Sequence, residues 1–360
     1  MLKSSYVTFF PPPDILAMPS FGLDVSDESI KFMQLRHTTT GIRVGRHGEK
    51  KIPPGIMEDG KVVDPARMQD ILSDLRQKEG VKSVRVSLPE EQIYLFKMRL
   101  EKEGLTNIRE NIELTLEEHI PIQAQNTIFD YEILGEDEKG LDLEVVAIPD
   151  AVIGNYLEVF RGAGISVQSV ELEAQAIARA VIKQGDMDTY MIVDFGEKRT
   201  GISIISRGIA MFTSTVDVGG SILTSTIMKS LGVSREEADR LKKEYGLQRN
   251  MENKEVFSLL LNSVSVLRDE VAKHFLYWHT HKDEQGKDNP PIKKILLCGG
   301  DSNLIGLSEY FSVSMKTQVE MANVWTNISD PSRRIPEMTF KRALSFAAAL
   351  GLALGDFEHD

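Results

Sequence analysis

Residues 190–196 read YMIVDFG, an apolar run that ends in an aspartate and a glycine. Such a run predicts a buried strand, and its small, polar end predicts a tight turn into the return strand TGISII at 200–205. The same layout occurs earlier, where FGLDV at 21–25 is followed by a turn and by SIKFMQL. Asp24 and Asp194 therefore occupy equivalent places, and this duplication predicts two similarly folded lobes.

A third turn follows the apolar run KKILLC, where Gly299 and Gly300 precede an aspartate. Turns of small residues let backbone N–H groups converge on an anion, and two carboxylates facing each other suit Mg²⁺. Each turn taken alone is equally well explained as the conformational end of a strand. The order and repetition of the three turns favour a nucleotide site.

Composition narrows the class of protein. The 360 residues are long for one core and favour two lobes or several subdomains. The net charge of −12 disfavours a nucleic-acid partner, and a single cysteine allows no intrachain disulfide. No apolar run approaches the ~20 residues that span a bilayer. The N-terminus lacks signal-peptide features, so we expect a cytoplasmic protein with a flexible arm at residues 1–19.

Local signals place several helices. Asp64 and Pro65 predict a helix start and Gly80 its end. Ser234 followed by Glu237 is a capping box, and Asp150 is expected to cap another helix. Further helices are predicted at about 106–119, 173–182, 254–281 and 345–355, and hairpins with a loop at about 41–60.

Longer segments carry a resemblance to a known family. They include IPPGIMEDGKVVDPARMQDIL from residue 52, SLPEEQIYLFKMRL from residue 87, VGGSILTSTIMKSLGVSREEADRLKKEYG from residue 218 and SFAAALGLALG from residue 345. In these segments and their order, from about Phe21 to Gly355, the chain resembles the PilM family of type IV pilus assembly proteins. The resemblance implies an α/β, actin-like fold, with ribonuclease H-like duplicated lobes and the four-subdomain architecture of the cell-division protein FtsA.

The resemblance also implies boundaries. Subdomain 1A is expected at 20–84, 145–187 and 337–360, the inserted subdomain 1C at 85–144, subdomain 2A at 188–216 and 291–336, and subdomain 2B at 217–290.

ATP is expected between the lobes, with Mg²⁺ held through water by Asp24 and Asp194. The other contacts that the resemblance implies are Gly22 in the first turn; Ser26, Gly196 and Thr200 at the phosphates; Gly219 and Gly220 at the ribose and phosphates; Asp239 and Lys242 at the ribose or adenine; Gly299, Gly300 and Asn303 at the adenosine; and Glu173 as a water-orienting catalytic residue. On a purely structural interpretation, Asp239 and Lys242 form a solvated helix face and Glu173 caps its helix.

The first turn departs from the family pattern. Relatives commonly have glycine where this chain has Ser26, and Asp27 and Glu28 follow directly. Acids beside a triphosphate weaken its binding unless they point to solvent. The sequence leaves open whether ATP is hydrolysed, and any hydrolysis is expected to be slow or regulatory.

As a function, the resemblance implies an ATP-binding scaffold of the pilus inner-membrane platform that binds the N-terminal cytoplasmic peptide of a PilN-like membrane protein. Other platform or motor proteins, and a homo-oligomer, are further partners to expect, with the membrane reached only through proteins. The alternatives are an FtsA-like filament and an actin-superfamily ATPase or kinase. The acidic ending GLALGDFEHD lacks the basic amphipathic tail of lipid-bound filaments.

Overall fold

The computed structural model describes residues 20–38, 41–88, 90–101, 107–250, 253–282, 286–328 and 338–357. It divides into two compact units. Unit 1 comprises Met1–Ala180, Trp325–Glu337 and Ala348–Asp360, and unit 2 comprises Val181–Val324 and Met338–Ala347. The arm predicted at residues 1–19 lies outside the described residues. The finer division into four subdomains stays a prediction.

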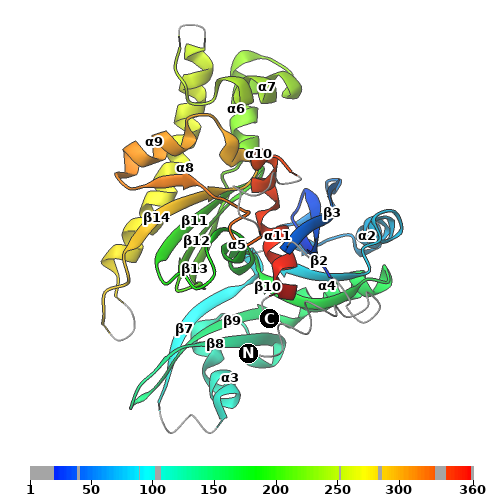
Figure 1. Cartoon of the computed structure of the whole chain (residues 1–360), viewed down its shortest axis with the longest axis vertical. Coiled ribbons are helices and arrows are strands. Elements are labelled where there is room, and N and C mark those ends of the chain that lie inside the picture. Colours follow the sequence, from blue (N-terminus) through cyan, green and yellow to red (C-terminus); the bar gives the residue numbers. More distant parts are fainter. Residues whose placement is uncertain are drawn as a thin grey trace. The chain divides into compact units, whose positions relative to one another are not determined.

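Unit 1 is built on a five-stranded sheet with the order β10-β6-β1-β2-β3 (Figure 1). Its strands are β1 (Phe21–Val25), β2 (Ser29–Thr38), β3 (Gly41–Lys51), β6 (Ser83–Leu88) and β10 (Ser166–Leu172). β1 pairs antiparallel with β2 and parallel with β6. The central strand β1 is buried along its whole length, as its apolar sequence predicts.

Two helices pack on one face of this sheet, α2 (Pro65–Glu79) and α4 (Asp150–Gly162). Asp64 accepts a hydrogen bond from the N–H of Arg67, and Gly80 ends α2 in the left-handed conformation, so both predicted ends of this helix are confirmed. The short strands β4 (Met57–Glu58) and β5 (Lys61–Val62) pair with each other before α2.

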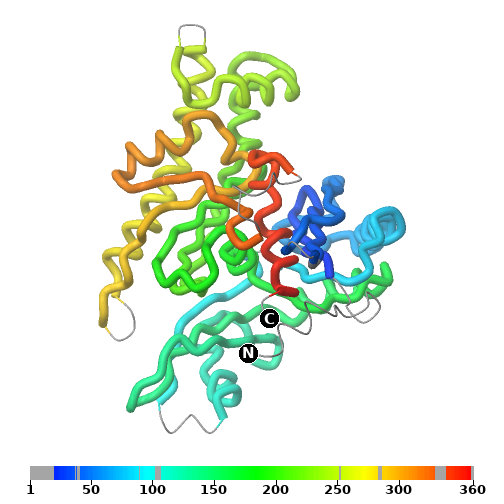
Figure 2. Tube along the Cα trace, in the orientation of Figure 1, coloured from blue at the N-terminus to red at the C-terminus, as the bar shows by residue number. Residues whose placement is uncertain are grey.

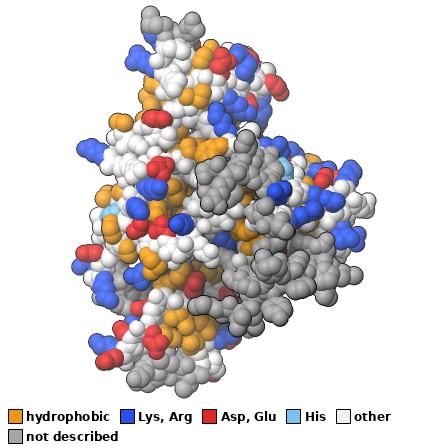
Figure 3. Space-filling model, viewed as in Figure 1, with side chains coloured by type: hydrophobic (Ala, Val, Ile, Leu, Met, Phe, Trp, Pro, Cys, Tyr) orange, Lys and Arg blue, Asp and Glu red, His pale blue; other side chains and the backbone are white. Residues whose placement is uncertain are grey.

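The hairpins and loop predicted for residues 41–60 are confirmed, because β3 pairs antiparallel with β2, β4 pairs antiparallel with β5, and a loop separates β3 from β4; the edge strand β3 itself is 11 residues long. Arg43 and Arg46 on it are exposed, and Figure 3 shows Lys and Arg side chains gathered over β3 and α2. Charged side chains on an edge strand discourage pairing with another chain. Gly41, Gly45 and Gly48 lie within β3 and do not interrupt the strand.

A smaller sheet with its own core is inserted in unit 1. Its elements are η1 (Glu90–Gln92), β7 (Tyr94–Glu101), α3 (Ile108–His119), η3 (Ala124–Asn126), β8 (Thr127–Glu136) and β9 (Gly140–Pro149). The strand order is β7-β9-β8 and both pairings are antiparallel. Ile112 and Leu116 of α3 are buried against Leu143 and Val145 of β9.

Small residues let the C-terminal helix lie close to elements from the start of the chain. The helices concerned are α5 (Glu173–Val181) and α11 (Ala347–Leu354). A methyl group added at Gly22 of β1 would lie 1.8 Å from the carbonyl oxygen of Ala349, and one added at Gly351 would lie 1.7 Å from that of Ala176. No side chain fits at either glycine. Figure 2 shows the C-terminal segment in red beside the first strands in blue.

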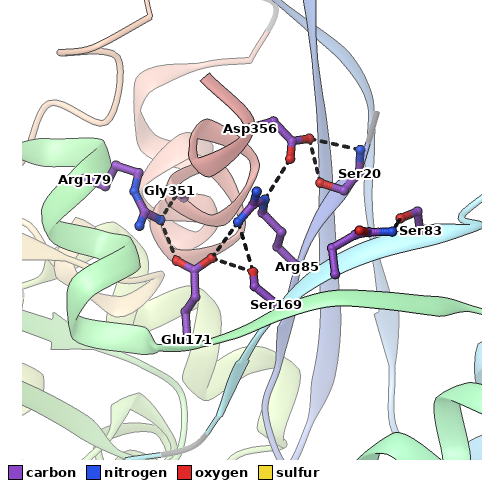
Figure 4. Close-up of polar contacts among 9 residues, drawn as sticks. Ser20, Ser83, Arg85, Ser169, Glu171, Arg179, Gly351 and Asp356 are labelled. Carbon is purple, nitrogen blue, oxygen red and sulfur yellow. Dashed lines mark hydrogen bonds and ion pairs between the residues drawn. The ribbon is translucent and has the colours of Figure 1, made fainter. Parts of the chain in front are cut away.

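A charged network ties the two ends of unit 1 together (Figure 4). Asp356 accepts hydrogen bonds from the N–H of Ser20 at 3.0 Å and from Nε of Arg85 at 2.7 Å. Arg85 also pairs with Glu171 at 3.3 Å, and Glu171 accepts from Arg179 of α5 at 2.7 Å. The network therefore joins the first described residue, two sheet strands, α5 and the C-terminal turn.

Unit 2 repeats the topology. Its five-stranded sheet has the order β13-β12-β11-β14-β15. The strands are β11 (Thr189–Phe195), β12 (Thr200–Ser206), β13 (Ile209–Val216), β14 (Ile292–Cys298) and β15 (Val319–Met321). β11 pairs antiparallel with β12 and parallel with β14, as β1 does with β2 and β6. The duplication predicted from the two aspartate turns is confirmed.

The helices of unit 2 follow the predicted signals. They are α6 (Gly220–Leu231), α7 (Arg235–Tyr245), α8 (Lys254–Thr280), η4 (Asp301–Asn303), α9 (Leu307–Met315), α10 (Phe340–Ala343) and η5 (Leu344–Phe346); the last described element, η6 (Gly355–Phe357), belongs to unit 1. Ser234 accepts from the N–H of Glu237 at 3.2 Å and so caps α7 as predicted, but the Glu237 carboxylate accepts from Arg240 instead of completing the capping box.

The predicted cap at Asp150 is wrong. Pro149, the last residue of β9, stands at the N-cap position, and no side chain caps α4. The strand passes into the helix without a linker, so Asp150 is already helical and its carboxylate cannot bond the N–H of the next turn as an N-cap does. Among the described residues, no helix is both long and apolar enough to cross a membrane.

Candidate functional site

The two predicted aspartates sit at matching registers. Asp24 of β1 lies opposite Lys31 of β2, with 3.6 Å between its carboxylate and the Lys31 ammonium. Ser87 of β6 donates to the same carboxylate at 3.4 Å. Asp194 of β11 lies opposite Gly201 of β12 and beside Cys298 of β14. The positions are equivalent, but the strands that flank Asp194 place no charged residue opposite it.

The turn after Asp24 is bonded within itself. The N–H and hydroxyl of Ser26 donate to the carbonyl of Ser29 at 2.9 and 3.1 Å, and the N–H of Ser29 donates to the Ser26 hydroxyl at 3.2 Å. Asp27 accepts from the N–H of Gly60 at 3.0 Å. The Ser26 hydroxyl thus serves the turn, and the Asp27 carboxylate faces the backbone of the loop before α2.

In unit 2, three glycine turns meet around the end of β11. The N–H of Gly220 donates to the carbonyl of Gly196 at 3.0 Å, which joins the start of α6 to the turn after β11. A methyl group at Gly219 would lie 2.3 Å from the backbone of Lys198. One at Gly299 would lie 2.4 Å from both the Asp194 carboxylate and the Phe195 carbonyl. The predicted glycines are therefore brought together.

In the third turn, at residues 299–300, the backbone conformation of Gly299 favours glycine. Gly299 has a φ of +90°, which side-chain-bearing residues rarely adopt, and its N–H donates to the carbonyl of Leu344 at 3.1 Å. Gly300 is helical, and a methyl group there would make only an ordinary contact with Ser345 at 3.6 Å. Asn303 donates to the carbonyls of Gly300 and Lys341 at 3.1 and 2.8 Å, so its amide fixes the turn.

The α7 residues join this cluster through an aspartate that follows β14. The ammonium of Lys242 lies 2.7 Å from the Asp301 carboxylate and 3.5 Å from that of Asp239. Burial raises the pKa of Asp301 by more than the Lys242 charge lowers it. Burial also acts to raise the pKa of Asp239, but its bond to Lys243 and the charge of Lys242 leave it below the usual value. Lys242 is buried, and the solvated face predicted for it on structural grounds is wrong.

Three further residues of the predicted site are Thr200, Glu173 and Gly22. Thr200 is fully buried and its hydroxyl donates to the carbonyl of Val218 at 2.5 Å. Glu173 is the first residue of α5, in unit 1. Gly22 faces Ala349, which accounts for glycine there by packing alone.

The unit 2 cluster fits a magnesium nucleotide. A carboxylate oxygen is the ligand type that Mg²⁺ takes from proteins, and Asp194 supplies one beside the glycine turns. At Gly219, Gly220 and Gly299 the protein's own atoms take the space of a side chain, whereas at Gly300 the nearest atom is 3.6 Å away, so Gly300 is the position in this cluster where a flat or charged ligand has room beside the backbone.

Sequence reasoning did not assign a role to Asp301 or to Glu144. Glu144 of β9 is 4% exposed, and burial raises its pKa to about 8. The signal for Asp301 was its place directly after the glycine pair. The signal for Glu144 was an acid in the middle of the apolar run LDLEVVAI.

Comparisons with known proteins bear on the family and the fold of this chain. The family model "Type IV pilus assembly protein PilM" matches residues 22–357. The cell division protein FtsA of Streptococcus pneumoniae serotype 2 is 24% identical over 348 residues, which cover 83% of this chain and 75% of FtsA.

Two solved structures share the fold. The PilM-PilN type IV pilus biogenesis complex aligns with a TM-score of 0.78 at 20% identity, covering 94% of this chain and 99% of that chain. MreB 5 of Spiroplasma citri bound to AMPPNP aligns with a TM-score of 0.56 at 15% identity, covering 94% and 95%. The fold is therefore actin-like, and because the family model spans nearly the whole sequence, this chain belongs to the type IV pilus assembly protein PilM family.

Proposed function

We propose that this chain is an ATP-binding scaffold of the type IV pilus inner-membrane platform, which binds the N-terminal cytoplasmic peptide of a PilN-like membrane protein. The observation that carries this proposal is the family match over residues 22–357, together with a solved relative captured as a PilM-PilN complex. The protein works on the cytoplasmic face of the inner membrane and reaches the bilayer through its partner.

The nucleotide part rests on unit 2. Asp194 holds Mg²⁺ through water, and the glycine turns at 196, 219–220 and 299–300 lie against the nucleotide. MreB 5, which shares the fold, was solved with AMPPNP bound, and this supports the assignment. The roles of Gly22, Asp24, Ser26 and Glu173 in unit 1 remain predictions. Hydrolysis is slow, because the scaffold role needs occupancy of the site rather than turnover.

The test is a calorimetric titration of the purified protein with the N-terminal cytoplasmic peptide of the cognate PilN-like protein, in the presence of Mg-ATP. We expect saturable 1:1 binding, and none with a scrambled peptide of the same composition. A folded sample that binds ATP but not the peptide would contradict the scaffold role. A sample that binds the peptide but not ATP would contradict the nucleotide role.

The FtsA match makes a filament the second candidate. Sedimentation with Mg-ATP, with and without liposomes of anionic lipid, separates the two. The scaffold stays in the supernatant in both conditions, whereas an FtsA-like filament pellets and binds lipid. Steady ATP turnover on the order of 1 s⁻¹ would instead favour an ATPase or kinase.

A further inference from the structure

Lys242 is a buried cation with three acceptors. Its side chain is 6% exposed, and its ammonium lies 2.7 Å from Asp301, 3.3 Å from the carbonyl of Gly220 and 3.5 Å from Asp239. An ammonium has three protons to donate and no capacity to accept. Two of these contacts are hydrogen bonds, to Asp301 and to the Gly220 carbonyl, and the contact with Asp239 is a longer ion pair, so acceptors within the protein surround the Lys242 ammonium.

Asp301 occupies the space that a side chain at Gly220 would fill. A methyl group added at Gly220 would lie 2.0–2.2 Å from the carboxyl atoms of Asp301. The glycine at the start of α6, the lysine of α7 and the aspartate after β14 thus interlock. These three positions come from segments that are 22 and 59 residues apart along the chain, measured from Lys242.

We propose that Asp301 and Lys242 form an internal ion pair that positions the glycine turns of the ATP site, and that Lys242 acts through this pair instead of donating to the nucleotide. This inference rests on the proposed ATP binding, and it replaces the nucleotide contact that family resemblance implies for Lys242. Both are positioning residues, because neither needs to touch the ligand. Asp239, whose side chain is 38% exposed, is the α7 group that remains accessible.

Ion-pair energetics provide a way to separate positioning from ligand contact. Removing one member of a buried pair leaves the other charge without a partner in a dry environment, which is strongly destabilising. Replacing both members by apolar residues of similar shape is often neutral. Methionine matches the length of lysine, and leucine matches the branching of aspartate. The double replacement thus restores the packing without restoring the ammonium.

The experiment compares K242M, D301L and the double variant K242M/D301L with the wild type. ATP affinity is measured by calorimetry with Mg-ATP, and folding by thermal unfolding. We expect each single variant to bind ATP about tenfold more weakly and to unfold at a lower temperature. The double variant recovers the unfolding temperature and binds ATP within about threefold of the wild type. Lys243→Ala is the matched control, since Lys243 is 72% exposed on the same helix.

Two outcomes overturn the inference. If the double variant regains its unfolding temperature but binds ATP as weakly as K242M, Lys242 contacts the nucleotide directly. If the folded single variants bind ATP like the wild type, the pair positions nothing. Asp301→Ala removes the acceptor and leaves Lys242 in place, so it decides the case if the double variant does not fold: unchanged affinity of this variant refutes positioning. A wild type that does not bind ATP refutes the proposed nucleotide role itself, and the inference with it.

Discussion

The two five-stranded sheets place an aspartate at the same register, but the residues around it differ. Asp24 has a lysine opposite and a serine beside it, and the following turn is closed by its own serine hydroxyl. Asp194 has Gly201 opposite and Cys298 beside it, and glycine turns surround it. One topology thus supports a carboxylate beside a lysine in unit 1 and a carboxylate beside glycine turns in unit 2.

The inserted sheet gives a third version of the same arrangement. Glu144 lies on the central strand β9, opposite Lys97 on one side and Glu132 on the other. One of its carboxyl oxygens is buried without a hydrogen-bond partner. The three sheets show that the surroundings of an acid on a central strand differ: Asp24 lies beside a lysine, Asp194 beside glycines, and Glu144 is buried, which raises its pKa.

The largest effect is expected at Gly299. Gly299→Ala adds a methyl group against Asp194 and Phe195 at a φ of +90°, so strain and overpacking should destabilise the protein by about 3 kcal/mol. Gly300→Ala is the control, because its φ is helical and the space is open. Urea unfolding measures both. Equal losses of stability for the two variants would show that the backbone at Gly299 does not require glycine.

Next in size is a pH effect at Glu144. Its pKa is raised to about 8 from 4.5, so between these values the folded protein keeps a proton that the unfolded chain has lost. The stability it contributes is present below about pH 4.5 and is lost as pH rises through about 8. At about 1.4 kcal/mol per pKa unit, even half of this shift corresponds to about 2 kcal/mol.

Glu144→Gln should therefore become more stable than the wild type as pH rises, with the difference largest near pH 8. Thermal unfolding across this range measures it. Glu132→Gln, an exposed residue in the same cross-strand row, should show a much shallower trend. Parallel curves for wild type and Glu144→Gln would mean that Glu144 is charged in the fold.

The aspartates themselves give the third prediction. Asp194→Ala should bind Mg-ATP about tenfold more weakly, near 1.4 kcal/mol, while staying folded by circular dichroism. Asp24→Ala should lose less, because Lys31 already offsets that carboxylate. Calorimetry with and without Mg²⁺ separates metal from nucleotide binding. An equal or larger loss for Asp24→Ala would reverse the proposed order of the two sites.

The smallest effect is expected at Lys31. Lys31→Met leaves the largely buried Asp24 without this cation and should cost about 1 kcal/mol of unfolding free energy. Lys51→Met is the control, since Lys51 is 68% exposed and surface pairs contribute little. Urea titration measures the difference in unfolding free energy. Identical midpoints for the two variants would show that the Lys31–Asp24 pair does not stabilise unit 1.

Much of this fold could be predicted from local sequence. The duplicated strand and turn pattern, the ends of α2 and the Ser234 cap of α7 depend on residues within a few positions of one another. Asp64 and Ser234 each cap their helix by accepting a hydrogen bond from the N–H three residues later, so these signals are local. The failed cap at Asp150 shows their limit, because a strand that runs directly into a helix leaves no capping residue.

The candidate site was predictable as a set of positions rather than as a set of contacts. In the sequence Lys242 does not differ from other polar residues of its helix, because its partner Asp301 is 59 residues away. Glu144 looks like an ordinary strand acid until burial changes its pKa. The Lys242–Asp301 contact and the burial of Glu144 both depend on packing between distant segments, which a pattern within one segment does not reveal.

The close contact between Gly22 and Ala349 also bears on how the chain is made. The first strand of unit 1 is synthesised well before α11, the helix that covers it. Unit 2 lies between them in the sequence and has its own core, so it is able to fold first. During synthesis, the face of β1 that carries Gly22 stays uncovered until α11 has been made. A chain that stopped before α11 would expose that face to chaperones, proteases and other nascent chains.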